Sequence, residues 1–331
     1  MNNSNDTEAG TPLLFARVLD GQGGGRAIDW AGIQQWEPAP GEVLWMHLCR
    51  NEPGVYEWLQ SHVGIPEPTA ELLTSDQTRP RAFREGNALV ATLRGINFNP
   101  GAEPEDMISM QVWSDGVRLI TLRRHPLQTP RRVLALIDRG TGPADAGAIV
   151  TALTEAMVAR MNASIVDMND HIDTLEEMDM DDDPEEMLQK IASIRRNCLG
   201  LQRHMGPQHV ALEAISRDAP HWFEEHDRRE IAETIDRLRR YLDDIDVSKE
   251  SAVVLMDELR TRALASNERA TYMLTIVAGI FLPLGFLTGL LGINVGGMPG
   301  VEDGSAFWWV TGGCVAIIVV LLAIFKRLKW L

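Results

Sequence analysis

Three consecutive residues, Gly292-Ile293-Asn294, have the type and position to handle a metal cation. They end a long apolar stretch, and Asn294 presents a neutral amide carbonyl. If several copies of the chain met around an axis, their asparagines would form a ring of carbonyl dipoles. Such oxygens can hydrogen-bond the water shell of a hydrated divalent cation without stripping it. Glu302 and Asp303 follow closely, and in every copy they would raise the local cation concentration.

Two charge-free apolar stretches, residues 272–291 and 307–325, flank the turn that holds these groups. Each is long enough to cross a bilayer, since a spanning helix needs about 20 apolar residues. Lys and Arg lie at the far ends of both stretches and are absent from residues 292–306. The positive-inside rule therefore predicts cytoplasmic N- and C-termini and an outer loop at 292–306. A plain Gly-Asn helix stop is the alternative interpretation of the motif.

A stripe of mostly small or polar residues leads up to the motif, in alternating steps of four and three. Its members are Leu264, Glu268, Thr271, Thr275, Ala278, Leu282, Gly285 and Gly289. This 3.5-residue spacing is typical of a helix that faces a bundle axis, where an ordinary coiled coil would place bulky apolar residues. We interpret the stripe as the lining of a pore. The alternative is a helix-packing surface of small residues around Gly285 and Gly289.

A second candidate group is acidic. Between residues 167 and 186, eleven residues are Asp or Glu and none is Lys or Arg. Asp167, Asp170 and His171 share one face of a predicted helix, and an imidazole with carboxylates can ligate zinc. A solvated polar face is the alternative interpretation of the same residues.

Composition excludes several classes of function. The net charge of -16 argues against nucleic acid as the main partner, because phosphate backbones are bound by clustered Lys and Arg. Cys49, Cys198 and Cys314 are far apart, which indicates neither a disulfide framework nor a thiolate zinc site. No nucleophile elbow, phosphate loop, zinc-protease motif or dinucleotide fingerprint is present, so we expect no enzyme and no cofactor.

The chain divides into four predicted parts. Residues 1–145 form a cytoplasmic α/β domain, with strand-length apolar runs at 43–48, 88–93, 107–113 and 117–122. Residues 146–220 form an acidic helical hairpin: one helix over 148–178, then a second that starts at Pro184 and is bent or broken at Gly206-Pro207. Residues 221–270 form a stalk helix, and residues 271–331 form the transmembrane hairpin. A continuous helix from about 220 to 291 would need packing along its length.

The C-terminal sequence resembles the CorA superfamily of divalent-cation transporters. The resemblance rests on the two spans, on Gly292-Ile293-Asn294, and on Leu274-Thr275 followed by Ile280-Phe281-Leu282-Pro283-Leu284. It covers the motifs of about the last 70 residues and the layout of the whole chain. It implies a funnel-shaped homopentamer with an α/β/α domain, a long stalk helix and two C-terminal transmembrane helices. It also implies that Asn294 is the selectivity position and that the stripe lines the pore.

Two departures separate the chain from the magnesium-transporting branch. Ile293 replaces a methionine, and Met298-Pro299 is followed by Gly300 rather than glutamate. The loop at 296–300 and the ending Lys329-Trp330-Leu331 are instead similar to the zinc-transporting ZntB branch. Asp257 lies roughly where magnesium-type members place a regulatory carboxylate, and the acidic helices imply a role in collecting cations.

The resemblance therefore favours transport of divalent cations, zinc above magnesium, across the bacterial inner membrane. The pore would be gated by the cytoplasmic funnel, and the partners would be other copies of the chain, the bilayer and the cations. Two alternatives stay open: a CorA-type magnesium or cobalt channel, and a membrane-anchored cytoplasmic sensor that transports nothing. The sensor would use the long helix only to hold subunits together.

Overall fold

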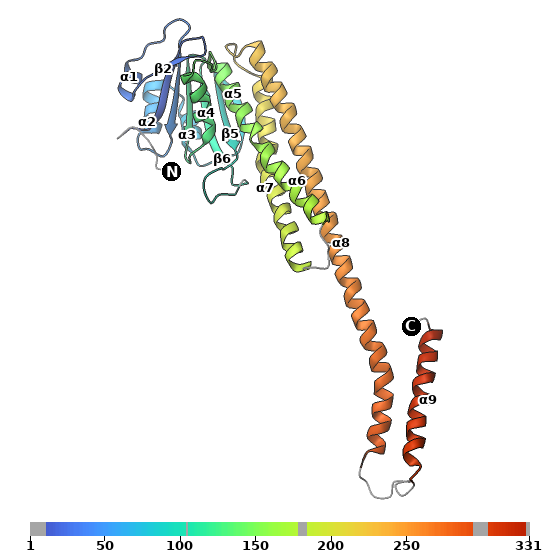
Figure 1. The fold of residues 1–331 in the computed structure, drawn as a ribbon. Helices are drawn as coiled ribbons and strands as arrows, with labels where there is room; N and C mark the ends of the chain where they lie inside the picture. The colour runs from blue at the N-terminus through green and yellow to red at the C-terminus, as the bar shows by residue number, and fades with distance from the viewer. Residues whose placement is uncertain (1–10, 104, 178–183, 294–303, 329–331) are drawn as a thin grey trace. The chain divides into compact units, whose positions relative to one another are not determined.

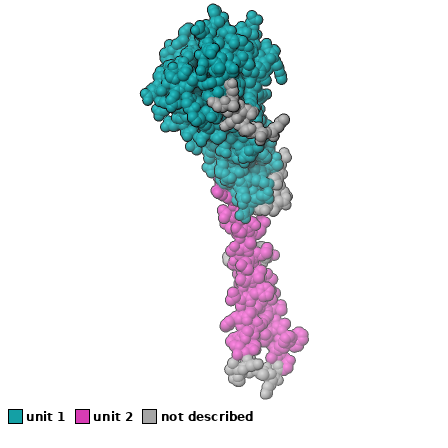
Figure 2. Space-filling model, turned by 90° about the vertical axis from the view of Figure 1, so that its left-hand side faces the viewer, with its two compact units in different colours: residues 1–256 teal, residues 257–331 magenta. Residues whose placement is uncertain are grey.

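The computed structural model describes residues 11–103, 105–177, 184–293 and 304–328 (Figure 1). It forms two compact units, residues 1–256 and residues 257–331 (Figure 2). The long helix α8 (Glu225–Leu291) contributes to both units. Asn294, Glu302 and Asp303 lie outside the described residues, so their roles stay predictions.

Unit 1 contains a seven-stranded sheet in the order β2-β1-β3-β7-β6-β5-β4. The strands are β1 (Leu13–Leu19), β2 (Gly25–Ala27), β3 (Val43–Cys49), β4 (Arg81–Glu85), β5 (Ala88–Gly95), β6 (Ile108–Ser114) and β7 (Arg118–Arg123). Among these described strands only β3 and β7 pair in parallel. The four predicted strands are confirmed as β3, β5, β6 and β7, whereas β1, β2 and β4 were not predicted.

Helices cover both faces of this sheet. On one face α1 (Trp30–Gln35), α2 (Val55–Trp58), the π turn η1 (Leu59–Val63) and α3 (Glu67–Thr74) bury a core with alternate strand residues such as Met46 and Ile120. On the other face, a Cβ at Gly95 would lie 3.3 Å from Met157 of α5 (Ala146–Ala159). Helix α4 (Gln128–Asp138) packs on α5, and α7 (Pro184–Arg217) crosses β4 and β5. The predicted α/β/α layering of this domain is therefore present.

Two details of the predicted helices are wrong. The helix expected over 148–178 is interrupted at Arg160, which separates α5 from α6 (Met161–Glu177). The Arg160 guanidinium lies 3.9 Å from the ring centroid of Phe98 and donates to Gln128 Oε1 at 3.0 Å. Helix α7 begins at Pro184 as predicted and runs through Pro207, so the predicted break is absent, while a bend there stays a prediction. There the Gln208 side chain accepts from the Arg94 backbone N–H at 2.6 Å, so packing on β5 holds the helix together.

Three helices of the described residues are long and apolar enough to cross a membrane, by length and composition. The first, Ala146–Leu175, has 56 % of its apolar window buried within unit 1, which identifies it as a core helix pair. The windows in α8 and in α9 (Ala306–Arg327) are 0 % buried. Exposed apolar surface of this extent is typical of segments that lie in lipid.

Candidate functional site

One face of α8 is fixed by packing inside unit 1. Ile231, Leu238, Ile245 and Ala252 recur every seven residues and are all buried. Polar contacts to neighbouring helices flank this seam: Ser248 Oγ donates to Asn169 Oδ1 of α6, and Gln202 of α7 donates to Asp246 at 3.0 Å. The seam is a coiled-coil repeat that turns one face of α8 toward α6 and α7. The opposite face is therefore left open.

That open face carries exposed apolar residues. Val247 and Val254 are 65 % and 62 % exposed, and Leu264 of unit 2 is 65 % exposed. Val247, Glu250 and Val254 are three and four residues apart in sequence. Asp257 follows three residues later, and Leu264 lies seven residues after Asp257. An unpartnered helix face with bulky apolar side chains usually marks an interaction surface. The sequence spacing is that of the stripe predicted for unit 2.

In unit 2 the predicted stripe lies on the face of α8 that α9 does not cover. The half-buried residues of α8 there are Ile276, Gly279, Ile280, Leu284 and Leu287. A Cβ at Gly279 would lie 3.0 Å from Cζ of Phe325 in α9, a side chain that is buried. By contrast, the stripe residues of this unit are exposed: Leu264, Glu268, Thr271, Thr275, Ala278, Leu282, Gly285 and Gly289. The structure thus places all eight on one open face.

Oxygen atoms dominate the polar chemistry of this face. A hollow of about 450 Å³ is lined by Leu264, Asn267, Glu268, Thr271, Tyr272 and Thr275. The Thr275 hydroxyl donates its proton to the Thr271 carbonyl at 2.8 Å, which leaves its oxygen lone pairs as acceptors. Hydroxyl, amide and carboxylate oxygens are the groups that hard divalent cations and their hydration water prefer.

The first membrane segment ends where the motif begins. The Gly292 N–H donates to Thr288 O at 2.9 Å and to Gly289 O at 3.2 Å, and α8 ends at Leu291. Ile293 is about half exposed and Asn294 lies beyond the described residues. The helix end required by the predicted motif is present, and the ring chemistry of Asn294 stays a prediction.

Of the four candidate metal ligands, Asp257 lies on the same helix as the stripe, and the other three lie on α6. Asp257 is exposed on the open face of α8, with Oδ1 3.9 Å from Arg260. Asp167, Asp170 and His171 are exposed on α6. Within the described part of the chain, no three His, Cys, Asp or Glu side chains lie close enough together to hold a metal ion. A metal role for these four residues stays a prediction.

Exposed aromatic residues lie at the start of each apolar stretch of unit 2. Phe307, Trp308 and Trp309 begin α9 and are exposed, and Tyr272 is exposed at the start of the apolar part of α8. Trp and Tyr are enriched at membrane–water interfaces, where the ring is half in lipid. Their positions at the ends of the apolar stretches could have been noticed in the sequence.

The comparisons with known proteins decide the family. Residues 40–327 match the family described as CorA-like Mg²⁺ transporter protein. The chain belongs to this family. It is 35 % identical over 321 residues to the divalent cation transporter CmaX of Pseudomonas aeruginosa, which covers 96 % of this chain and 97 % of CmaX. It is 32 % identical over 327 residues to the zinc transport protein ZntB of Yersinia pseudotuberculosis, covering 96 % of each.

The solved structure of full-length CmaX has the same CorA-like fold. It aligns with a TM-score of 0.84 at 35 % identity and covers 96 % of this chain and 98 % of that one. The α/β domain, the long helix α8 and the C-terminal apolar helices are thus features of the CorA-like fold. The predicted kinship with the CorA superfamily, near its ZntB branch, is confirmed.

Proposed function

We propose that this CorA-like chain transports divalent cations across the bacterial inner membrane, with zinc as the favoured cargo. The observation that carries the proposal is the open stripe on α8, which faces away from α9 and bears oxygen ligands among small residues. One copy cannot enclose a path with a single helix face, whereas several copies around an axis can. The CorA resemblance implies five copies, arranged as a funnel.

The proposed route starts outside the membrane and ends in the cytoplasm. Glu302 and Asp303 gather cations, and a ring of Asn294 carbonyls accepts them with their hydration water. The stripe from Gly289 to Leu264 then lines the conduit. On the cytoplasmic side, Asp257 and the acidic helix with Asp167, Asp170 and His171 collect the released ions. Rings of Val247 and Val254 on the open face of α8 would act as apolar constrictions, the kind that gate a pore by dewetting.

Flanking charge supports the proposed topology. Lys326 and Arg327 lie in the last turn of α9, and Arg262 and Arg269 precede the apolar part of α8. The positive-inside rule places all four on the cytoplasmic side, together with the N- and C-termini. The four-part division at residues 145, 220 and 270 belongs to the same proposal: α/β domain, acidic hairpin, stalk and membrane hairpin.

Zinc is favoured only by sequence similarity, which is seen in the overall identity to ZntB and in two positions near the motif. The relatives at 35 % and 32 % identity are a divalent cation transporter and a zinc transport protein. In addition, Ile293 and Gly300 depart from the magnesium-type sequence. The second candidate is a magnesium or cobalt channel, which the family description favours. A sensor that moves no ion is the third.

The test is cation uptake into liposomes that contain the purified full-length protein. We expect zinc uptake above that of protein-free liposomes and faster than magnesium uptake. Asn294→Ala should slow zinc uptake by about tenfold or more, as a barrier increase of about 1.4 kcal/mol would. Asn51→Ala is the matched control, because Asn51 is exposed in unit 1, far in sequence from the stripe. Native mass spectrometry of the same sample should give the mass of five chains.

Each contrary result identifies a different rival. Faster magnesium than zinc uptake would support the magnesium channel. Uptake of neither ion would support the sensor. Unaltered zinc uptake in Asn294→Ala would contradict the selectivity role of that residue, and a monomer or dimer would contradict the pentamer.

A further inference from the structure

Two adjoining hollows open in unit 1, in a region that the proposed transport route does not use. Strands β3, β5 and β7 run in the same direction, so their carboxyl ends lie at the same end of the sheet, and the hollows open there. Arg50 follows β3, Arg94 lies near the end of β5, and Arg124 follows β7. The hollows measure about 500 and 520 Å³ and share Thr78, Arg94 and His204.

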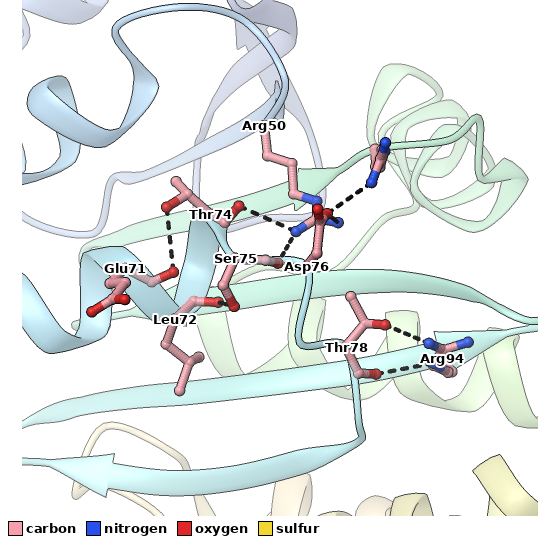
Figure 3. A network of polar contacts seen from close by, with 9 residues as sticks. Arg50, Glu71, Leu72, Thr74, Ser75, Asp76, Thr78 and Arg94 are labelled. Atoms are coloured by element: carbon pink, nitrogen blue, oxygen red, sulfur yellow. Dashed lines mark hydrogen bonds and ion pairs between the residues drawn. The ribbon is translucent and has the colours of Figure 1, made fainter.

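In the first hollow, Arg50 and Arg124 are already paired with groups of the protein. Arg50 donates to the carbonyls of Thr74, at 3.3 Å, and of Ser75, at the end of α3, and to Asp76 Oδ1 at 3.1 Å (Figure 3). Arg124 donates to the same Asp76 oxygen at 2.8 Å. Two more carboxylates, those of Glu105 and Asp106, line this hollow. Its arginines therefore hold the loop after α3, and we assign no ligand to it.

The second hollow has a guanidinium with only neutral partners. Arg94 donates from Nε to Thr78 O at 2.9 Å and from Nη2 to Thr78 Oγ1 (Figure 3). It also donates from Nη1 to Met107 O at 2.6 Å. No carboxylate within the described residues forms an ion pair with Arg94, although its side chain is partly buried. Burial, and next the charge of Arg203, lower the pKa of Arg94. Arg94 is therefore partly desolvated and forms no ion pair within the described residues, although Glu105 and Asp106 line the first hollow, which it shares.

Two further arginines border this hollow. Arg79 precedes β4 and Arg203 lies on α7, and both are exposed. Neither has an ion-pair partner in the described part of the chain. His204 lies beside them, and burial, followed by the charges of Arg94 and Arg203, lowers its pKa to about 4. The histidine is therefore neutral near pH 7 and can either donate or accept a hydrogen bond.

The resulting charge distribution is unusual for this protein. The chain has a net charge of -16, yet the described lining of the second hollow comprises Gln77, Thr78, Arg79, Arg94, Arg203 and His204, with no Asp or Glu. The three guanidinium groups come from three separate segments of the fold. Like charges brought together repel one another, so this arrangement favours an anion that neutralises them.

We propose that this second hollow binds a small, multiply charged anion of the phosphate class. A guanidinium donates two parallel N–H bonds to phosphate oxygens, and such charge-assisted pairs are about twice as strong as neutral ones. Three arginines match the charge of a diphosphate or triphosphate group. A volume of about 520 Å³ is that of a small-molecule site and is more than a single atomic ion needs. The bound anion would link α7 to β5 and to the segment before β4.

The test is calorimetric titration with pyrophosphate of the full-length protein in detergent, after a chelating resin has removed divalent cations. We expect one site per chain and binding that weakens with added salt. The Arg79→Gln/Arg203→Gln double variant should bind about tenfold more weakly or worse, a loss of about 1.4 kcal/mol or more. Both arginines are exposed and unpaired in the described chain, so the fold should persist, which thermal unfolding checks. Arg240→Gln, at an exposed site on α8, should bind like the wild type.

Three results would overturn the proposal. Equal affinity in the double variant would place the binding elsewhere. No binding to the wild type would mean that something else, such as a carboxylate of a second copy, neutralises the arginines. Citrate, a tricarboxylate of similar charge, is the comparison for ligand class, and citrate binding as tightly as pyrophosphate would refute the phosphate assignment. The titration needs no transport activity, so its outcome is independent of the proposed function.

Discussion

Asp227 shows how one side chain can make the stability of this protein depend on pH. It lies in the first turn of α8 with its side chain fully buried, and its Oδ2 accepts from the Glu224 N–H at 2.9 Å. A Cβ at Gly147 would lie 2.2 Å from that oxygen, so the close approach requires glycine there. Burial raises the pKa of Asp227 to about 6. The backbone hydrogen bond and His226, whose Nε2 lies 3.3 Å from Oδ1, lower this pKa, and Asp145 and Glu230 raise it.

The direction of the pH effect follows from this raised pKa. The folded state holds the Asp227 proton more tightly than the unfolded chain does, because the pKa of this carboxyl group is 3.8 when the chain is unfolded. The contribution of this group to stability is therefore full at low pH and is lost as pH rises through about 6. Asp227→Asn cannot titrate. Its stability relative to the wild type should thus increase by about 1 kcal/mol between pH 5 and pH 7.5.

Thermal unfolding of the purified protein at the two pH values measures this difference. Asp236→Asn, at an exposed position two turns along α8, should show the same difference at both pH values. A pH-independent difference for Asp227→Asn would mean that folding does not raise the pKa of this carboxyl group.

The sequence predicts sites made of neighbouring residues, but it does not predict sites whose residues are far apart along the chain. Gly292-Ile293-Asn294 is contiguous and stands out at a helix end. Arg79, Arg94 and Arg203 are spread over more than 120 positions. Only the pairing of β4 with β5 and the crossing of α7 bring them to one hollow, and no spacing rule signals it.

Among the elements, helix faces were predictable and marginal strands were not. The stripe on α8 could be predicted because a long helix with one covered and one open face has a repeating pattern. Strand β4, with the sequence Arg-Ala-Phe-Arg-Glu, is a half-exposed edge strand that depends on pairing with β5. Strand propensity is decided largely by such neighbours. The interruption at Arg160 was likewise invisible, because the apolar spacing continues across it.

The pairing of α8 with α9 predicts opposite effects for two glycines of α8. At Gly279 a Cβ alone would lie 3.0 Å from Phe325, so Gly279→Leu should overpack this contact and cost about 1–3 kcal/mol. At Gly285 nothing lies within 4 Å of an added Cβ, and leucine is a better helix former than glycine. Thermal unfolding should therefore show a lower midpoint for Gly279→Leu and not for Gly285→Leu. Equal losses would contradict the assigned faces of α8.

On the scale of the whole molecule, the proposed function needs more than one chain. Within unit 1, α8 carries exposed apolar residues, and within unit 2 it carries exposed small or oxygen-bearing residues. The family and the fold were predictable from the order of the elements and the C-terminal motif. The subunit number was not, because a 3.5-residue spacing fits rings of several sizes.

Zinc uptake into liposomes by a pair of adjacent variants tests whether cations pass along the α8 stripe. Ala278 lies on the stripe, and Val277 points about 100° away around the helix. We expect Ala278→Phe to reduce uptake about tenfold or more, since a bulky ring from every copy would fill the axis, while Val277→Phe keeps the wild-type rate. Wild-type uptake by Ala278→Phe, or equal loss in both variants, would contradict the account.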